Sequence, residues 1–507
     1  MAVKRRVGFR IDPSREPGRW KRAGNRELKM VSEPRGRSAR VLSPRRERPL
    51  QRPAVSSGGR KPLPQLRGRA REGTVNQGGT TEVLSRFRPC GLLPAEDGSV
   101  FLCFRLHEAQ KNVLRGAKTI VVLSKGIYLT SSLFLKSHME FRMEEGAILL
   151  GTTDESQYPI MHTRVAGVEM EWTVGILNVN GQEDVKITGK GCIDGQGPYW
   201  WNKYWGEDRK GGMRKVYEAK GLRWCVDYDC RRSRNLVVME SKNVNLSDFE
   251  SRRSGFWNIH ICYSKNIHVE KLHIYDNEGP STDGIDIDSC DGVVVERCKI
   301  ACNDDSICVK SGRDADGLRV NRICQNILIQ ECEILTGSGV TIGSETSGGA
   351  RNITIRNLKY HGTDCGFRLK SARTRGGVIE DVLVENLKMV NVKYPFSMCL
   401  DWNPSYSYCE IPKDYQGEIP EHWRRLAIPV PEEKGIPQVK NLIIRNVISE
   451  NEPDYAGISR AFDVSAFPEH PITHVTMENI KIQAKEFGKI SGIKDWKLMN
   501  VEITTEE

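Results

Sequence analysis

The phrase Lys265-Asn266-Ile267-His268-Val269 decides the fold class, because close variants of it recur along the chain. Each copy places polar residues before alternating apolar positions, as in Lys242-Asn243-Val244-Asn245-Leu246. This alternation with a period of two is typical of a short β-strand with one buried face. The first apolar residues of the copies are Val244, Ile267, Val293, Ile327, Ile353, Val382, Leu442 and Val475.

Most copies follow one another after 23 to 34 residues. A unit of this length cannot bury its apolar face alone and must stack on its neighbours. A leucine-rich repeat would need a ladder of leucines that is absent, and a propeller blade needs four strands in about 40 residues. The repeat therefore predicts an all-β fold, a right-handed single-stranded parallel β-helix, with coils about 4.8 Å apart.

The interval from Val382 to Leu442 is too long for one coil. It contains Asp401-Trp402-Asn403-Pro404 and Glu418-Ile419-Pro420-Glu421, which are typical of a loop. We expect a long insertion here, and such loops on a rigid scaffold often shape a binding site.

The chain has 507 residues and a net charge of +11, but this charge is unevenly distributed. Residues 1–90 hold 24 Lys and Arg against 7 Asp and Glu, whereas residues 91–507 hold 52 against 58. The basic character therefore belongs to the first segment and does not predict that the main domain binds nucleic acid. We predict two parts: a basic, disordered segment over 1–90 that is of doubtful relevance to the enzyme, and a β-helix domain over 91–507.

Three interpretations of residues 1–90 remain open: a tail for an anionic surface, a transit peptide, or translation from a start codon placed too far upstream, which we favour. The segment lacks the apolar core of a secretory signal. No run of about 18 apolar residues occurs in the chain, so we expect no transmembrane helix and no membrane partner.

The 15 cysteines include no Cys-x-x-Cys pair, which argues against a zinc ribbon. Cys290, Cys298, Cys308 and Cys332 lie inside apolar strand-like runs. We expect free thiols that pack as small buried hydrophobes rather than a disulfide framework.

Three carboxylates fall at nearly the same position on two successive coils. Asp283 lies in Ser281-Thr282-Asp283-Gly284, and Asp304 and Asp305 follow about one coil later. We expect them to stack on one exposed face, where like charges raise the pKa of at least one group and permit acid/base chemistry. The alternative is an ordinary solvated turn, in which Asp is common.

Two cations occupy a similar position two coils further on. Arg368 and Lys370 project to the same side of one strand, and Ser338 in Gly337-Ser338-Gly339 lies on the coil between. The cationic pair could bind the carboxylate of an acidic sugar, or it could form a structural salt bridge.

These motifs, in their order and spacing, resemble glycoside hydrolase family 28, the polygalacturonase family. The matching segments are Ser281-Thr282-Asp283, Asp304-Asp305, Gly337-Ser338-Gly339 and Arg368-Leu369-Lys370, with Ile307-Cys308-Val309-Lys310 and Gly191-Cys192-Ile193-Asp194-Gly195 in support. The phrase Ile342-Gly343-Ser344-Glu345 is similar to the exo-acting, bacterial and plant-like branch.

The resemblance implies a pectin-lyase-like solenoid that hydrolyses α-1,4-galacturonosidic bonds of pectin with inversion, from a chain end, without a metal or another cofactor. It implies that Asp304 is the general acid and that Asp283 and Asp305 activate water. Arg368 and Lys370 would bind the galacturonate carboxylate, and Ser338 and Lys310 would also contact the substrate. The expected partner is a pectic polysaccharide or an oligogalacturonide, for a monomeric enzyme that is secreted or periplasmic.

Two positions depart from the family pattern: Ser281 stands where the family has Asn, and Ser338 stands where it has His. The His is thought to assist the general acid, so its absence bears on rate and pH optimum. Three alternatives stay open. They are hydrolysis of rhamnogalacturonan or xylogalacturonan, a calcium-dependent pectate lyase, and a non-catalytic carbohydrate-binding β-helix.

Overall fold

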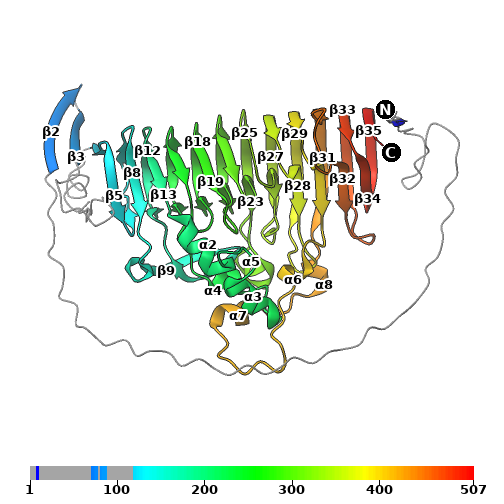
Figure 1. Cartoon of the computed structure of the whole chain (residues 1–507), viewed down its shortest axis with the longest axis horizontal. Helices are drawn as coiled ribbons and strands as arrows, with labels where there is room; N and C mark the ends of the chain where they lie inside the picture. Colours follow the sequence, from blue (N-terminus) through cyan, green and yellow to red (C-terminus); the bar gives the residue numbers. More distant parts are fainter. Residues whose placement is uncertain (1–6, 11–69, 78–79, 88–117, 507) are drawn as a thin grey trace.

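The computed structural model describes residues 7–10, 70–77, 80–87 and 118–506. Residues 118–506 form a long solenoid of stacked parallel strands, with a group of short helices on one side (Figure 1). Each coil contributes to three rows of strands. This arrangement confirms the predicted right-handed parallel β-helix.

The first row contains the recurring phrase. Its strands are β4 (Lys118–Leu123), β7 (Met139–Met143), β12 (Glu183–Thr188), β15 (Lys242–Ser247), β18 (Lys265–Glu270), β21 (Asp291–Glu296), β24 (Cys324–Gln330), β27 (Ala350–His361), β29 (Val378–Val390), β31 (Gln438–Glu450), β33 (Ile472–Ala484) and β35 (Ile493–Thr505). Val244 pairs with Ile267, which pairs with Val293, and the same register continues through every predicted copy to Val475.

The second row turns the coil, and the third row closes it. The second row holds β5 (Gly126–Thr130), β8 (Ala147–Gly151), β13 (Cys192–Asp194), β16 (Glu250–Arg252), β19 (His273–Asn277), β22 (Lys299–Cys302) and β25 (Glu333–Ile334), and then merges into the long strands from β27 onward. The third row holds β6 (Leu133–Phe134), β11 (Leu177–Asn180), β14 (Leu236–Met239), β17 (Ile259–Cys262), β20 (Ile285–Asp288), β23 (Ile307–Lys310), β26 (Val340–Ile342), β28 (Cys365–Lys370), β30 (Tyr394–Cys399), β32 (Arg460–Ser465) and β34 (Glu486–Ser491).

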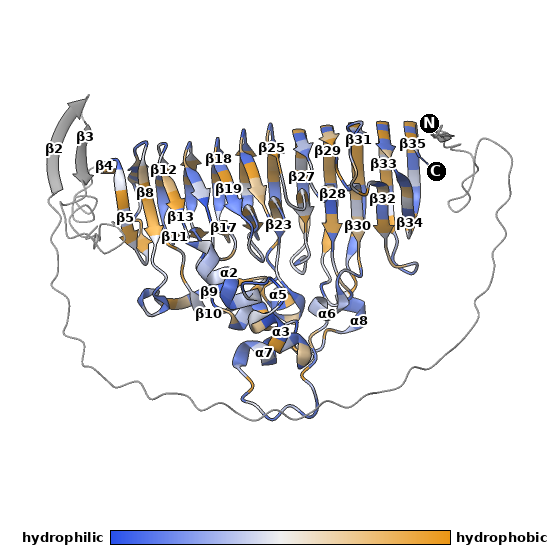
Figure 2. Cartoon of the chain, viewed as in Figure 1, coloured by the Kyte–Doolittle hydropathy of each residue, from blue (hydrophilic) through white to orange (hydrophobic). Residues whose placement is uncertain are grey.

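The buried apolar residues of all three rows form one continuous core along the solenoid. Hydrophobic positions recur along the strands from one end of the solenoid to the other (Figure 2). The residue before the first apolar position is Asn in many copies, as at Asn243, Asn266 and Asn326, and it has a positive φ near 55°. Asn tolerates this left-handed conformation better than other non-glycine residues, which explains its recurrence in the phrase. Asn266 also donates a hydrogen bond to Asn243 of the preceding coil.

Four inserted segments leave the solenoid on the same side. They are the antiparallel hairpin β9 (Ile160–Val165) and β10 (Val168–Thr173), preceded by the short helix η1 (Glu155–Gln157); the helices α2 (Gly197–Trp205), α3 (Gly212–Ala219) and α4 (Val226–Asp229); the helix α5 (Asp314–Val320); and the helices α6 (Pro404–Ser407), α7 (Glu421–Leu426) and α8 (Glu432–Gly435). The last group is the predicted insertion. Trp172, Trp224 and Trp423 join three of these segments in a second apolar core.

The cysteines between residues 118 and 506 are all free. Cys290, Cys298, Cys308 and Cys332 are buried, which confirms the expectation of small packed thiols. Among the described residues, no helix combines the length and the hydropathy that a membrane span requires.

Within residues 1–90 the structure describes β1 (Val7–Arg10), β2 (Ala70–Gln77) and β3 (Thr80–Phe87). β1 pairs with β35, β2 pairs with β3, and β3 lies parallel to β4. The rest of this segment and the domain boundary at residue 91 lie outside the described residues. The predictions of a disordered segment and of a domain beginning at residue 91 therefore stay predictions.

Candidate active site

The outward face of the third row carries the polar residues of the site. Because side chains alternate along a strand, the buried Ile285 and Ile287 leave Asp286 on the outer face of β20. Asp286 lies in register with Cys308 on β23, Thr341 on β26 and Arg368 on β28. One ladder of outward positions on four consecutive coils therefore holds three polar side chains and the thiol of Cys308.

The three predicted carboxylates lie in the loops that enter β20 and β23. The backbone N–H of Gly284 donates to the carbonyl of Asp305 at 2.9 Å, which stacks the two loops on neighbouring coils. Carboxylate oxygens of Asp283, Asp304 and Asp305 all lie within 4.8 Å of one another. The structure thus brings together the three acids whose spacing predicted their convergence.

The expected exposure of these acids is wrong. Asp283 is 3% exposed and Asp305 is fully buried, while Asp304 is partly exposed. The reason is the second apolar core: the inserted helices cover this face of the solenoid and turn it into the floor of a pocket.

Asp305 is held by several groups. Its Oδ2 lies 2.7 Å from Lys370 Nζ, and its Oδ1 accepts a hydrogen bond from Thr341 at 2.7 Å and lies 3.4 Å from Arg368 Nη1. Burial alone would raise the pKa of Asp305, but Lys370, Arg368 and Lys310 outweigh it and hold this pKa well below the usual range. Asp305 is therefore ionised at neutral pH.

Asp304 has the opposite tendency. Burial and the adjacent charge of Asp305 raise the pKa of Asp304, against the opposing influence of Lys370 and Arg368. Burial and the charges of Asp286 and Asp304 likewise raise the pKa of Asp283. The pocket therefore contains one carboxyl group that ionises more readily than a free carboxyl group and two that hold their protons to higher pH.

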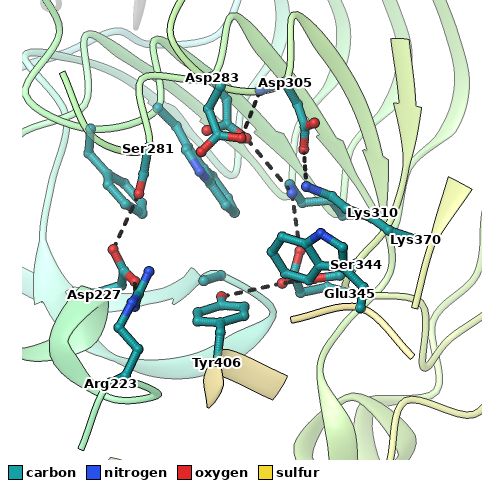
Figure 3. Close-up of a pocket in the computed structure, with 15 residues that line it drawn as sticks. Arg223, Asp227, Ser281, Asp283, Asp305, Lys310, Ser344, Glu345, Lys370 and Tyr406 are labelled. Atoms are coloured by element: carbon teal, nitrogen blue, oxygen red, sulfur yellow. Dashed lines mark hydrogen bonds and ion pairs between the residues drawn. The ribbon is translucent and has the colours of Figure 1, made fainter. Parts of the chain in front are cut away.

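Lys310 lies beneath the acids and is 4% exposed. Its Nζ lies 3.9 Å from Asp283 Oδ2 and 3.1 Å from Glu345 Oε2 (Figure 3). The same atom lies 3.7 Å from Asp286 Oδ1. The negative charge around it outweighs the effect of burial and raises the pKa of Lys310 well above its usual value. The charged ammonium of Lys310 thus lies among three buried carboxyl groups and is nearest to that of Glu345.

The remaining predicted site residues differ in their placement. Lys370 lines the pocket, with its ammonium 4.5 Å from the centre of the Trp402 ring. Arg368 lies beside it and contacts Asp305. Ser338 is buried one layer away, where its backbone N–H donates to the carbonyl of Asp304 at 2.8 Å, and it is not among the lining residues of the pocket.

The pocket gathers residues from the solenoid and its connecting loops and from three of the four insertions, with none from the α5 segment. Its lining is Ala166, Arg223, Asp227, Phe256, Trp257, Ser281, Asp283, Asp304, Asp305, Lys310, Ser344, Glu345, Lys370, Trp402 and Tyr406. Sequence reasoning missed Asp227 and Arg223, which lie in a segment without any repeat signal. Tyr406 and Trp402 lie in the predicted insertion, and Glu345 lies in a quoted motif, but neither context assigned them a role.

Asp227 forms the wall opposite the acids (Figure 3). Its Oδ2 accepts from Arg223 at 3.0 Å, and its Oδ1 accepts from Arg232 at 3.0 Å and from Ser281 at 3.2 Å. Ser281 is one of the two departures from the family pattern, and its hydroxyl links the loop that carries Asp283 to this wall.

The family model of glycosyl hydrolases family 28 matches residues 162–412. A probable polygalacturonase of Vitis vinifera is 27% identical over 370 residues, which cover 70% of this chain and 65% of that relative. An endo-polygalacturonase of Pectobacterium parmentieri is 27% identical over 304 residues, or 54% of this chain and 65% of the relative. The match thus spans about two thirds of the length of these curated relatives.

Among solved structures, the exopolygalacturonase of Thermotoga maritima shares the fold, with a TM-score of 0.61 and 23% identity over 78% of this chain and 88% of that structure. The relatives include proteins named for both modes of attack, at chain ends and within chains. The matched region from 162 to 412 contains every residue of the pocket floor.

Proposed function

Because the chain belongs to glycosyl hydrolases family 28, we propose that it hydrolyses α-1,4-galacturonosidic bonds in pectin and releases single sugars from a chain end. The observation that carries this proposal is the group of three carboxyl groups within 4.8 Å, two of which differ in the direction of their pKa shift. A hydrolase that works by acid and base needs one protonated and one ionised carboxyl group at the same bond.

Asp304 is the general acid in this proposal. Its raised pKa keeps a proton available for the glycosidic oxygen. Asp305 remains ionised and accepts a proton from the attacking water, and Asp283, on the neighbouring coil, orients that water. The ammonium of Lys370 faces the pocket and supplies the positive charge that a galacturonate carboxylate requires, with Arg368 beside it.

The insertions support the proposal of attack at a chain end. Arg313, at the start of α5, donates to the carbonyl of Tyr406, and the indole of Trp224 donates to the carbonyl of Glu410 at 3.1 Å. These contacts tie the 401–435 insertion to the other inserted segments, and its Trp402 and Tyr406 line the pocket. We propose that this wall stops the polymer, so that only a terminal sugar reaches the acids.

The test is a product profile on homogalacturonan, rhamnogalacturonan and xylogalacturonan. Chromatography of the earliest products from homogalacturonan should show galacturonate monomer alone. A ladder of mixed oligomers at the first time points would refute attack at the chain end, and turnover of only one of the other polymers would reassign the substrate.

Two further measurements distinguish the proposed hydrolase from a pectate lyase and from a non-catalytic carbohydrate-binding protein. A pectate lyase would produce an unsaturated, ultraviolet-absorbing product and lose activity with a chelator, whereas the proposed reaction does neither. A non-catalytic carbohydrate-binding solenoid would bind an oligogalacturonide in calorimetry without releasing any reducing end.

A further inference from the structure

Glu345 is a buried carboxylate in the pocket wall that the proposed mechanism does not use. It follows β26 and is 3% exposed. Its Oε2 lies 3.1 Å from Lys310 Nζ, closer than either Asp286 or Asp283 lies to the same ammonium. Glu345 is therefore the tightest acidic partner of the cation beneath the acids.

The other oxygen of Glu345 is also held. Its Oε1 accepts from Ser344 Oγ at 2.9 Å and from Tyr406 OH at 3.4 Å (Figure 3). Tyr406 belongs to α6 of the insertion, whereas Lys310 belongs to β23 of the solenoid. Glu345 thus joins the floor of the pocket to its inserted wall.

The other cationic side chains near Glu345 form ion pairs with other carboxylates. Arg375 and Arg313 both pair with Asp314, and Lys370 pairs with Asp305. Within residues 118–506, the only ion pair of Glu345 is the one with Lys310. Lys310, Arg375, Lys370 and Arg313 together overcome the effect of burial and lower the pKa of Glu345 to about 2, so this carboxylate stays charged.

We propose that Glu345 is a positioning residue: it holds the Lys310 ammonium away from Asp283 and Asp286 and thereby lets these two carboxyl groups keep a proton. Asp286 supports this assignment, because both of its oxygens are buried without a hydrogen-bond partner and its only described cation is Lys310 at 3.7 Å. A carboxylate in that setting is stable only if its charge is neutralised. Among the described residues, Lys310 is the cation that pairs with Asp286, and Glu345 competes for the same ammonium.

The deciding variant is Glu345→Gln, which keeps the size of the side chain and removes its charge. The ammonium of Lys310 then interacts with Asp283 and Asp286 without competition from Glu345, so the pKa of both acids falls. At a given pH, a smaller fraction of these two acids is then protonated. Lys310 also acts to lower the pKa of the general acid Asp304. Without the charge of Glu345 to offset Lys310, the alkaline limb of the pH profile of kcat/KM should therefore move to lower pH by about one unit. Tyr406→Phe is the matched control, because it removes one contact of Glu345 and leaves the charge, so the position of the limb should not move.

The activity readout rests on the proposed function, so a second readout is needed that does not. Between pH 5 and 7.5 Glu345 is ionised in both the folded and the unfolded chain, and its own titration adds no slope to stability. Acids with a raised folded pKa stabilise the fold at low pH, and this stabilisation is lost as the pH rises through that folded pKa. The Tm of the wild type should therefore fall over this range by about 1–2 °C more than the Tm of Glu345→Gln.

The proposal would be overturned if the Tm of Glu345→Gln fell with rising pH as much as the Tm of the wild type, and the alkaline limb of kcat/KM stayed at its wild-type position. If Glu345→Gln does not fold, Glu345→Asp is the second variant: its shorter reach withdraws the charge from Lys310, and a smaller shift in the same direction is expected. An unmoved limb and an unchanged Tm slope there would equally overturn it. If the wild type cleaves no pectic substrate, the proposed function fails, and the Tm series still decides the role of Glu345.

Discussion

Lys370 Nζ lies 2.7 Å from Asp305 Oδ2, and this ion pair keeps Asp305 ionised beside Asp304, whose pKa shifts in the opposite direction. The cation lowers the pKa of Asp305, and the resulting negative charge joins burial in raising the pKa of Asp304. The contact therefore prepares the base of the proposed reaction, and burial together with the charge of that base prepares the acid.

Lys370→Gln tests this relationship. Loss of the cation raises the pKa of Asp305, and because the base must be ionised, the acidic limb of kcat/KM should move to higher pH by about one unit. The Michaelis constant should also rise, since we propose that Lys370 binds the sugar carboxylate. The control is Lys359→Gln, which breaks an exposed ion pair with Glu333 on another face. An acidic limb at the wild-type position in Lys370→Gln would contradict the account.

The insertion wall gives a prediction about the mode of attack. Trp423 is 3% exposed, and its indole donates to Asp229 Oδ2 at 2.9 Å, next to the wall residue Asp227. Trp423→Ala should loosen the wall, so that chromatography of early products shows oligomers beside the monomer. Ile428→Ala, at a position that is 51% exposed in the same insertion, should leave monomer as the first product. If Trp423→Ala still released monomer alone, the 401–435 insertion would not determine whether the enzyme attacks at a chain end.

The register of the solenoid was predictable because a buried strand cannot slip by one residue without exposing its whole apolar face. This constraint placed Val244, Ile267 and their successors correctly, and with them Asp283 beside Asp304 and Asp305. The opposite wall was not predictable. Asp227 and Tyr406 reach the pocket from insertions of irregular length, and no periodicity in the sequence measures the distance between such segments. These insertions also cover the face of the solenoid that carries the three acids, which is why Asp283 and Asp305 are buried and not exposed.

The stereochemistry of the product is a separate prediction. The general spacing rule associates carboxyl separations of about 5–5.5 Å with retention, and the oxygens here lie within 4.8 Å. However, both oxygens of Asp305 are occupied, by Lys370 and Thr341, which leaves this carboxylate poorly placed to attack carbon. We therefore expect inversion, as the family resemblance implies. Proton NMR of the first turnover should show the β-anomer, and the α-anomer would contradict this prediction.

The N-terminal segment gives a stability prediction. A chain that begins at residue 91 should keep the Tm and the activity of the full chain, because residues 1–90 are expected to contribute nothing to folding. A second chain beginning at residue 70 retains β2 and β3, of which β3 lies along β4. If only the shorter chain loses several degrees of Tm, the β3–β4 pairing matters and the prediction is wrong.

The central claim is that Asp304 donates the proton in hydrolysis of a pectic bond, and the activity of Asp304→Asn tests it most directly. The amide keeps the size and most hydrogen bonds of the carboxyl group but cannot act as an acid. We expect kcat to fall by about 10²–10⁴, as is typical of general acid catalysis, with an unchanged Tm. Asp248→Asn, at an exposed turn of another face, is the control and should match the wild type. Activity of Asp304→Asn within about threefold of the wild type, on a pectic substrate that the wild type turns over, would contradict the account.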